Sequence, residues 1–316
     1  MAWSRAARIG GAVAGGVLAA GVAAAVVGSY IWRRGVVRRE DALIQRMRLS
    51  RDRTERPFRR SDLADLPAPV ARYFAFAIPD GQRRIRVARV HWAGDMRLQP
   101  DAEWSPFTAE QRFTVSPPGF VWDARVRMMP VIPVRVRDSY VAGEGQMLGR
   151  IGGVVNVVNE GGTREMASSA LVRWLGEAAW FPTALLPGDD VTWQSVDDST
   201  ARATLTDGDI RVSGDFRFAP TGEMTAMTAV RYRDVNGTGV ETPFEGRYLG
   251  FERRQGVMVP KSAEVAWLLP EGRFAYWRGR PTSIAYDFAT APALEFNVSS
   301  SPAVLPAVRT DRSSRR

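Results

Sequence analysis

Short apolar runs alternate with turn dipeptides about every 8–14 residues from residue 85 to residue 286. Within many of these runs apolar and polar side chains alternate, as in strands that bury one face. The pairs between the runs favour hairpins, and they include Asp207-Gly208, Asn236-Gly237, Gln255-Gly256 and Glu271-Gly272. The pattern predicts an antiparallel meander of about ten strands, and a sheet of that width must curl or close.

One helix is expected to interrupt the meander. Thr163 is a candidate N-cap, Glu165 falls in the first turn, and Pro182 ends the segment. The apolar positions between them follow the helical period, so one face should pack on the sheet. The predicted fold is therefore α+β, a mainly antiparallel β half-barrel or open barrel with one helix on its concave face. A shorter helix is expected over Asp65–Ala77.

The first 32 residues are predicted to form an N-terminal transmembrane helix that anchors the chain. Residues 9–32 carry no charge and lie between Arg8 and Arg33. At 1.5 Å per residue they reach roughly 36 Å, enough to cross a hydrocarbon core of about 30 Å. A cleavable signal peptide with a small-residue site near Ala23 and Ala25 is the alternative. The apolar stretch continues beyond that site, which favours the uncleaved anchor.

The net charge of +9 is concentrated in the flanks of the sequence. Residues 1–60 hold thirteen arginines against four acidic residues, whereas residues 61–308 hold 26 basic and 29 acidic residues. A nucleic-acid-binding domain would carry its positive field on the folded surface, so no nucleic-acid partner is expected. Residues 33–60 are interpreted as a basic juxtamembrane stalk whose arginines can lie along anionic lipid headgroups. Membrane lipids are thus the expected partners of the span and of this basic flank.

The rest of the chain is predicted to form one domain and a tail. A single β-rich domain is expected over residues 61–295, followed by a basic C-terminal tail over residues 296–316. The expected location is the inner membrane, with one pass. Orientation stays open, because Arg33 and Arg34 after the span favour a cytoplasmic domain, whereas long domains translocate largely regardless of charge. The sequence indicates no oligomeric state.

Composition excludes several kinds of chemistry. The chain has one histidine, His91, and no cysteine, so it cannot build a zinc finger, an iron–sulfur cluster or a Cys–His nucleophile. The glycine-rich stretches are not followed by the Gly-Lys-Ser/Thr of a phosphate loop. No metal site and no cofactor are predicted.

The candidate ligand-binding residues come from three places. Arg173, Glu177 and Trp180 share one side of the expected helix. Two neighbouring strands and a later strand contribute the others, which are Trp122, Asp123, Asp138, Tyr140 and Tyr232. An amphipathic aromatic lining suits an apolar or amphiphilic ligand. The same residues would also fit surface ion pairs, charge ladders between strands and aromatic core filling.

These features predict a membrane-anchored binding protein that holds a lipid or another apolar ligand in the cavity of a curved sheet. Two alternatives remain open. One is an enzyme of unknown reaction that uses Asp123, Asp138, Tyr140 and Glu177 as acid and base groups. The other is an envelope scaffold that binds a second protein at a sheet edge.

Several motifs resemble a known bacterial family classed only as a domain of unknown function. They are the runs at residues 66–74, 104–111, 120–124 and 173–187, together with the N-terminal span, and the resemblance covers roughly residues 65–290. It brings no known activity or catalytic residue. More remotely, the expected architecture is similar to periplasmic lipoprotein carriers and mycobacterial lipid-carrier lipoproteins, which implies an extracytoplasmic domain. This chain departs from those carriers in its spanning anchor and in lacking a lipidation cysteine.

Overall fold

The computed structural model describes residues 3–50, 56–128, 133–235 and 237–289, with residues 3–25 given as helical backbone. Thirteen strands form one antiparallel sheet in the order β6-β5-β4-β3-β2-β1-β13-β12-β11-β10-β9-β8-β7. The strands of the first half are β1 Ile85–Met96, β2 Ser105–Thr114, β3 Gly119–Val126, β4 Val134–Val141, β5 Glu144–Ile151 and β6 Val155–Gly161. Those of the second half are β7 Val191–Ser195, β8 Thr200–Asp207, β9 Ile210–Phe218, β10 Met224–Val235, β11 Thr238–Arg254, β12 Val257–Leu269 and β13 Gly272–Phe288.

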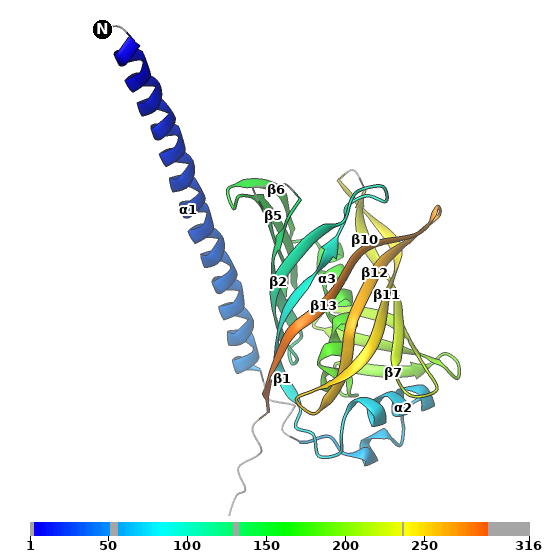
Figure 1. Cartoon of the computed structure of the whole chain (residues 1–316). Coiled ribbons are helices and arrows are strands. Elements are labelled where there is room, and N and C mark those ends of the chain that lie inside the picture. Colours follow the sequence, from blue (N-terminus) through cyan, green and yellow to red (C-terminus); the bar gives the residue numbers. More distant parts are fainter. Residues whose placement is uncertain (1–2, 51–55, 129–132, 236, 290–316) are drawn as a thin grey trace, which may run out of the picture.

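Two meanders, β1–β6 and β7–β13, join through antiparallel pairing of β1 with β13, where Val90 lies opposite Ile284. The sheet curls into an open half-barrel around a central helix (Figure 1). The prediction of a mainly antiparallel, open and curved sheet is confirmed.

Helix α3, Arg164–Glu177, lies in the hollow of the sheet and contacts strands of both meanders. Its N-cap is Thr163, whose Oγ1 accepts a hydrogen bond from the Met166 amide at 3.1 Å, as the sequence predicts. Hydrogen bonds fix the helix to the sheet, including one from Trp174 Nε1 to the carbonyl of Thr114 and one from Tyr248 to the carbonyl of Gly176. Two short 3-10 helices follow, η2 Ala178–Trp180 and η3 Pro182–Leu185.

A glycine makes room for the start of α3. Gly145 of β5 is buried, and a Cβ atom there would lie 2.5 Å from the carbonyl oxygen of Met166. Gly145→Ala should therefore push α3 away from β5 and lower the free energy of unfolding by about 1–3 kcal/mol. Urea unfolding measures the loss. Gly188→Ala is the control, because a Cβ atom at Gly188 meets nothing within 4 Å; equal losses in both variants would contradict this packing argument.

One end of the half-barrel is covered by the segment before β1. It contains η1 Arg60–Leu63 and α2 Ala68–Ala77, which agrees with the helix expected over Asp65–Ala77. Val70, Tyr73 and Phe74 of α2 are fully buried, and the Phe74 ring packs edge-on against Trp193 of β7. Aromatic side chains therefore fill this end, and Figure 1 shows α2 at the opposite end from the β5–β6 hairpin.

Helix α1 runs without interruption from Trp3 to Leu49, so residues 33–49 of the expected stalk continue the helix. Its C-terminal half packs on the outer face of β2, β3 and β4, while its N-terminal half extends beyond the sheet (Figure 1). Trp32 is 1% exposed and donates from Nε1 to Asp123 Oδ1 at 2.7 Å. Further along, Arg46 pairs with Asp207 at 2.6 Å, and Tyr140 also donates to that carboxylate. The helix and the sheet thus form one packed unit.

Among the residues whose side chains are described, no helix carries an apolar stretch long enough to cross a membrane. The predicted span falls for the most part on residues 9–25, which lie outside that set.

Trp32 should hold the C-terminal half of α1 on the sheet. Trp32→Ala removes a buried indole and its hydrogen bond to Asp123, a change that costs about 3–5 kcal/mol in protein cores. The expected result is local release of the helix, with trypsin cleavage between Arg33 and Arg48 accelerated by about tenfold or more. Tyr30→Ala is the control, because Tyr30 is 63% exposed. If both variants were cleaved at the wild-type rate, Trp32 would not be the anchoring contact.

Candidate functional site: an apolar cavity between α3 and the sheet

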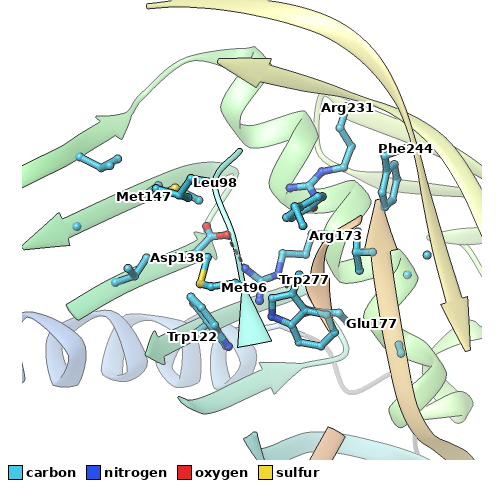
Figure 2. A pocket seen from close by; sticks show the side chains of 18 of the residues that line it. Met96, Leu98, Trp122, Asp138, Met147, Arg173, Glu177, Arg231, Phe244 and Trp277 are labelled. Carbon is cyan, nitrogen blue, oxygen red and sulfur yellow. Dashed lines mark hydrogen bonds and ion pairs between the residues drawn. The ribbon is translucent and has the colours of Figure 1, made fainter. Parts of the chain in front are cut away.

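A cavity of about 560 Å³ lies between α3 and the inner face of the sheet. This volume falls in the range of small-molecule sites, about 300–1,000 Å³. Its described lining is apolar apart from four charged residues, and Figure 2 shows side chains of both kinds. Methionine is prominent in this lining, with Met96, Met128, Met147 and Met227. Because methionine is flexible and polarisable, such a wall can adapt to ligands of different shape.

Apolar side chains remain exposed at one end of this cavity. Leu98, Met128 and Val157 line it while being 67%, 36% and 50% exposed. Leu98 follows β1 and Met128 follows β3, and antiparallel pairing places both loops at the same end as the β5–β6 turn. We call this end the mouth. It lies opposite α2, so the half-barrel is covered at one end and carries apolar side chains at the other.

The inner part of the cavity holds a charged triad formed by Arg173, Asp138 and Glu177. Arg173 bonds Asp138 Oδ2 at 2.7 Å and Glu177 Oε1 at 3.0 Å, and Figure 2 shows its guanidinium directed at Asp138. Gln111 donates to the other oxygen of Glu177 at 2.8 Å. The Arg173 guanidinium also lies over the Trp122 ring at 4.9 Å. With both carboxylates on one cation, the triad carries one net negative charge.

Burial raises the pKa of Glu177, and the nearby Arg173 opposes that effect. Arg173 is itself held charged by its two carboxylate partners, which raise its pKa against the effect of burial. A cation bonded on both sides by carboxylates has little capacity left for a ligand. We therefore interpret Arg173 chiefly as a residue that organises the wall of the cavity.

Arg231 of β10 is the second cation on the lining, and Figure 2 shows it beside Phe244. Its guanidinium lies 5.3 Å from the centre of the Phe244 ring, and its Nε donates to the carbonyl of Ser169 at 3.1 Å. Among the described residues it forms no ion pair with a carboxylate. Unlike Arg173, Arg231 can still pair with an anionic group of a ligand.

Gly246 of β11 also lies on the lining. It is a buried strand residue between Phe244 and Tyr248, which line the cavity too. A Cβ atom at Gly246 would meet nothing within 4 Å. The cavity therefore extends directly to the backbone of β11 at this position.

The cavity brings together five of the eight residues that the sequence nominates: Trp122, Asp138, Arg173, Glu177 and Trp180. The other three lie elsewhere. Asp123 is on the outer face, where it pairs with Arg135 and accepts from Trp32; Tyr140 donates to Asp207; and Tyr232 donates to Glu241. The four acid and base groups of the enzyme alternative therefore do not share the cavity, because only Asp138 and Glu177 line it.

Sequence reasoning missed Arg231 and the methionines. The alternation of side chains along β10 could have indicated Arg231. Met227 and Arg231 are four residues apart, so they face the same side of the strand. An arginine on the apolar face of a strand is unusual unless it has a partner. No cluster of three or more His, Cys, Asp or Glu side chains suited to a metal occurs among the described residues. The site can thus hold an apolar or amphiphilic molecule and offers it one cation.

Comparisons with known proteins give one family and two structures. A LolA superfamily protein from Nitrosomonas europaea is similar with a TM-score of 0.36 and 10% identity, over 69% of this chain and 92% of that chain. A DUF1329 family protein from Desulfovibrio piger is similar with a TM-score of 0.35 and 9% identity, over 66% of this chain and 88% of that chain. These likenesses are too distant to carry a function across. The search of curated proteins found no match.

The family model that matches covers residues 56–279, which include all thirteen strands except the end of β13. The match confirms the resemblance that the four sequence runs indicate. The chain belongs to the family of unknown function DUF6544.

Proposed function

We propose that the protein is a membrane-anchored binding protein that holds a lipid or another apolar ligand in the cavity. The observation that carries this proposal is the cavity itself, about 560 Å³ of space with an apolar, methionine-rich and aromatic lining. Such surface is favourable to fill, at about 25 cal/mol per Å² of apolar area removed from water. Arg231 offers a cation for the polar end of an amphiphile, so the preferred ligand has an acidic headgroup and an apolar tail.

The membrane anchor is the second part of the proposal. Residues 9–32 are uncharged, and α1 continues as one helix from this stretch onto the sheet. Val26, Val27 and Ile31 are each more than half exposed where α1 leaves the sheet. Exposed apolar side chains on a helix that continues into an uncharged stretch favour insertion into a bilayer.

The anchor and the mouth of the cavity lie at the same end of the domain. Gly28 of α1 packs on the β5–β6 turn, where a Cβ atom on Gly28 would lie 2.5 Å from Val154 Cγ2. Val154 and Val155 of that turn are 51% and 59% exposed. A membrane that held the start of α1 would therefore face an apolar mouth, which gives a ligand a route that avoids water. We extend the proposal to a single-pass inner-membrane protein with an extracytoplasmic domain, which a reporter fused to the C-terminus would test.

Extraction of the purified full chain tests the binding function. Organic extraction and native mass spectrometry should find about one lipid or similar amphiphile per chain. A chain that carries no ligand and binds no added fatty acid or phospholipid would overturn the proposed function.

The mouth should control exchange of the ligand with membranes. Leu98→Glu combined with Val155→Glu places two charges on the apolar mouth, and we expect transfer of a fluorescent fatty acid to vesicles to slow by about tenfold or more, because the charges disfavour contact with lipid. Stopped-flow energy transfer measures the rate. The matched control is Leu249→Glu with Val196→Glu, two similarly exposed apolar residues at other sites. Equal slowing in both pairs would show that transfer does not pass through the mouth.

A further inference from the structure

A second hollow, of about 320 Å³, lies on the outer face of the sheet between α1 and strands β4 and β5. Four arginines line it, and we call it the arginine groove: Arg34 and Arg38 from α1, Arg137 from β4 and Arg150 from β5. The other lining residues are Tyr30, Ile31, Trp32, Gly35 and Leu148, so the lining contains no acidic residue.

None of the four arginines forms an ion pair with a carboxylate in the described part of the chain. Arg34 lies over the Tyr30 ring at 5.9 Å, and Arg150 donates to Asn156 Oδ1 at 2.7 Å. Arg137 lies over the Trp32 ring at 5.7 Å and donates to Gln146 at 3.3 Å. All of these partners are neutral. Four like charges on one hollow repel each other, and an anion placed among them would relieve that repulsion.

The groove is built around Arg137, which is only 8% exposed. A Cβ atom at Gly35 would lie 2.4 Å from Arg137 Nη1, so a larger residue at this turn of α1 would displace the guanidinium. Arg137 Nε is buried without a hydrogen-bond partner. Burial lowers the pKa of Arg137, and neighbouring Arg39 and Arg150 lower it further, while the Asp123 carboxylate partly opposes these effects. Arg137 therefore lacks a hydrogen-bond acceptor for its Nε.

The groove also lies at a defined distance from the apolar part of α1. Arg34 follows the exposed apolar Ile31 by three residues, which is about 4.5 Å along a helix. The headgroup layer on each side of a bilayer is roughly 5–8 Å thick beyond the hydrocarbon core. If the apolar residues up to Ile31 lie in hydrocarbon, Arg34 lies within the headgroup layer.

We propose that the arginine groove binds the phosphate group of an anionic phospholipid, at a site separate from the ligand cavity. Guanidinium groups bind phosphate oxygens through paired hydrogen bonds, which suits the four arginines around the hollow. The proposal rests on the anchoring part of the proposed function, since the anchor brings the groove to the headgroup layer.

Native mass spectrometry of the full chain tests this site, with phosphatidylglycerol and phosphatidylcholine of identical acyl chains added to the detergent-purified protein. The wild type should bind phosphatidylglycerol at about tenfold lower concentration. Arg38→Gln combined with Arg150→Gln should remove that preference, and Arg38→Gln alone should reduce it. The matched control, Arg48→Gln with Arg125→Gln, removes the same charge from exposed arginines outside the groove and should keep the preference. In a chain that carries Gly246→Trp, which fills the cavity, the preference should persist.

The outcomes separate the groove from the other proposals. Equal binding of the two lipids by the wild type, or equal loss of the preference in the control, overturns the groove site. If inorganic phosphate displaced phosphatidylglycerol at the same concentration, the groove would bind free phosphate rather than a lipid. Carbonate washing of native membranes tests the anchor independently of the groove. Release of the chain by the wash would contradict anchoring. A chain that stays in the membrane but shows no lipid preference would contradict only the groove.

Discussion

Gly246→Trp should abolish ligand binding while leaving the fold intact. Gly246 lines the cavity, and its Cβ position is open for at least 4 Å, so an indole can enter the space that a ligand would occupy. No left-handed backbone conformation is required at this position, so β11 accepts the larger residue. We expect the amount of co-purified ligand to fall by about tenfold or more, and stability to change by less than about 1 kcal/mol or to rise, because the indole buries apolar surface.

The control for this experiment is Gly188→Trp, which adds the same side chain at an open position between α3 and β7. It should keep the wild-type amount of ligand by extraction and mass spectrometry. Retention of the full amount of ligand by Gly246→Trp would place the ligand outside the cavity.

Arg173→Met should cause a large loss of stability. The variant leaves Asp138 and Glu177, with side chains 5% and 15% exposed, without their shared cation. Removing one partner of a buried ion pair costs about 3–5 kcal/mol, because the remaining charge stays desolvated. Denaturant unfolding measures this loss. Arg202→Met is the control, since the Arg202 side chain is 50% exposed in its pair with Asp215 and such pairs contribute only about 0–1 kcal/mol.

The loss in Arg173→Met should depend on pH. Burial raises the pKa of Glu177 in the folded protein, and without Arg173 the pKa rises further. The folded state then binds a proton more tightly than the unfolded state. The free energy of unfolding therefore falls as the pH rises from the pKa of Glu177 in the unfolded state to its higher pKa in the folded state. We expect the deficit to be smaller at about pH 5 than at about pH 8. A deficit independent of pH would mean that lost packing, rather than uncompensated charge, causes it.

Alternation and turn chemistry predict most of the sheet, with the exception of β5 and β6. The sequence around Gly143 and Gly145 is typical of a loop between two strands, because glycine is rare in strands. In the structure Gly145 is a strand residue, and its missing side chain is required by the close approach of α3. Local sequence cannot reveal this, because the reason lies in a helix that begins nearly twenty residues later.

The site was predicted only in part, and the limit has a physical cause. Helical spacing groups Arg173, Glu177 and Trp180 on one side, and the curl of the sheet brings Trp122 and Asp138 to them. Asp123 follows Trp122 directly and therefore points to the outer face, where α1 covers it. Tyr140 is close to Asp138 in the sequence and faces the same side of β4, but it pairs with Asp207 of a distant strand. Strand parity gives the face of a residue, whereas its height along a curved barrel depends on pairing that sequence spacing does not give.

The continuity of α1 from the predicted span to its contacts on β3 and β8 determines how the domain can move. A flexible tether would let a binding domain tumble and swing between two membranes. If the proposed span lies in a bilayer, the docked helix instead fixes the height and tilt of the half-barrel relative to that membrane. Under the proposed function, the protein would then reach only the lipid surface directly in front of its mouth, and an onward acceptor of the ligand would have to come to the domain.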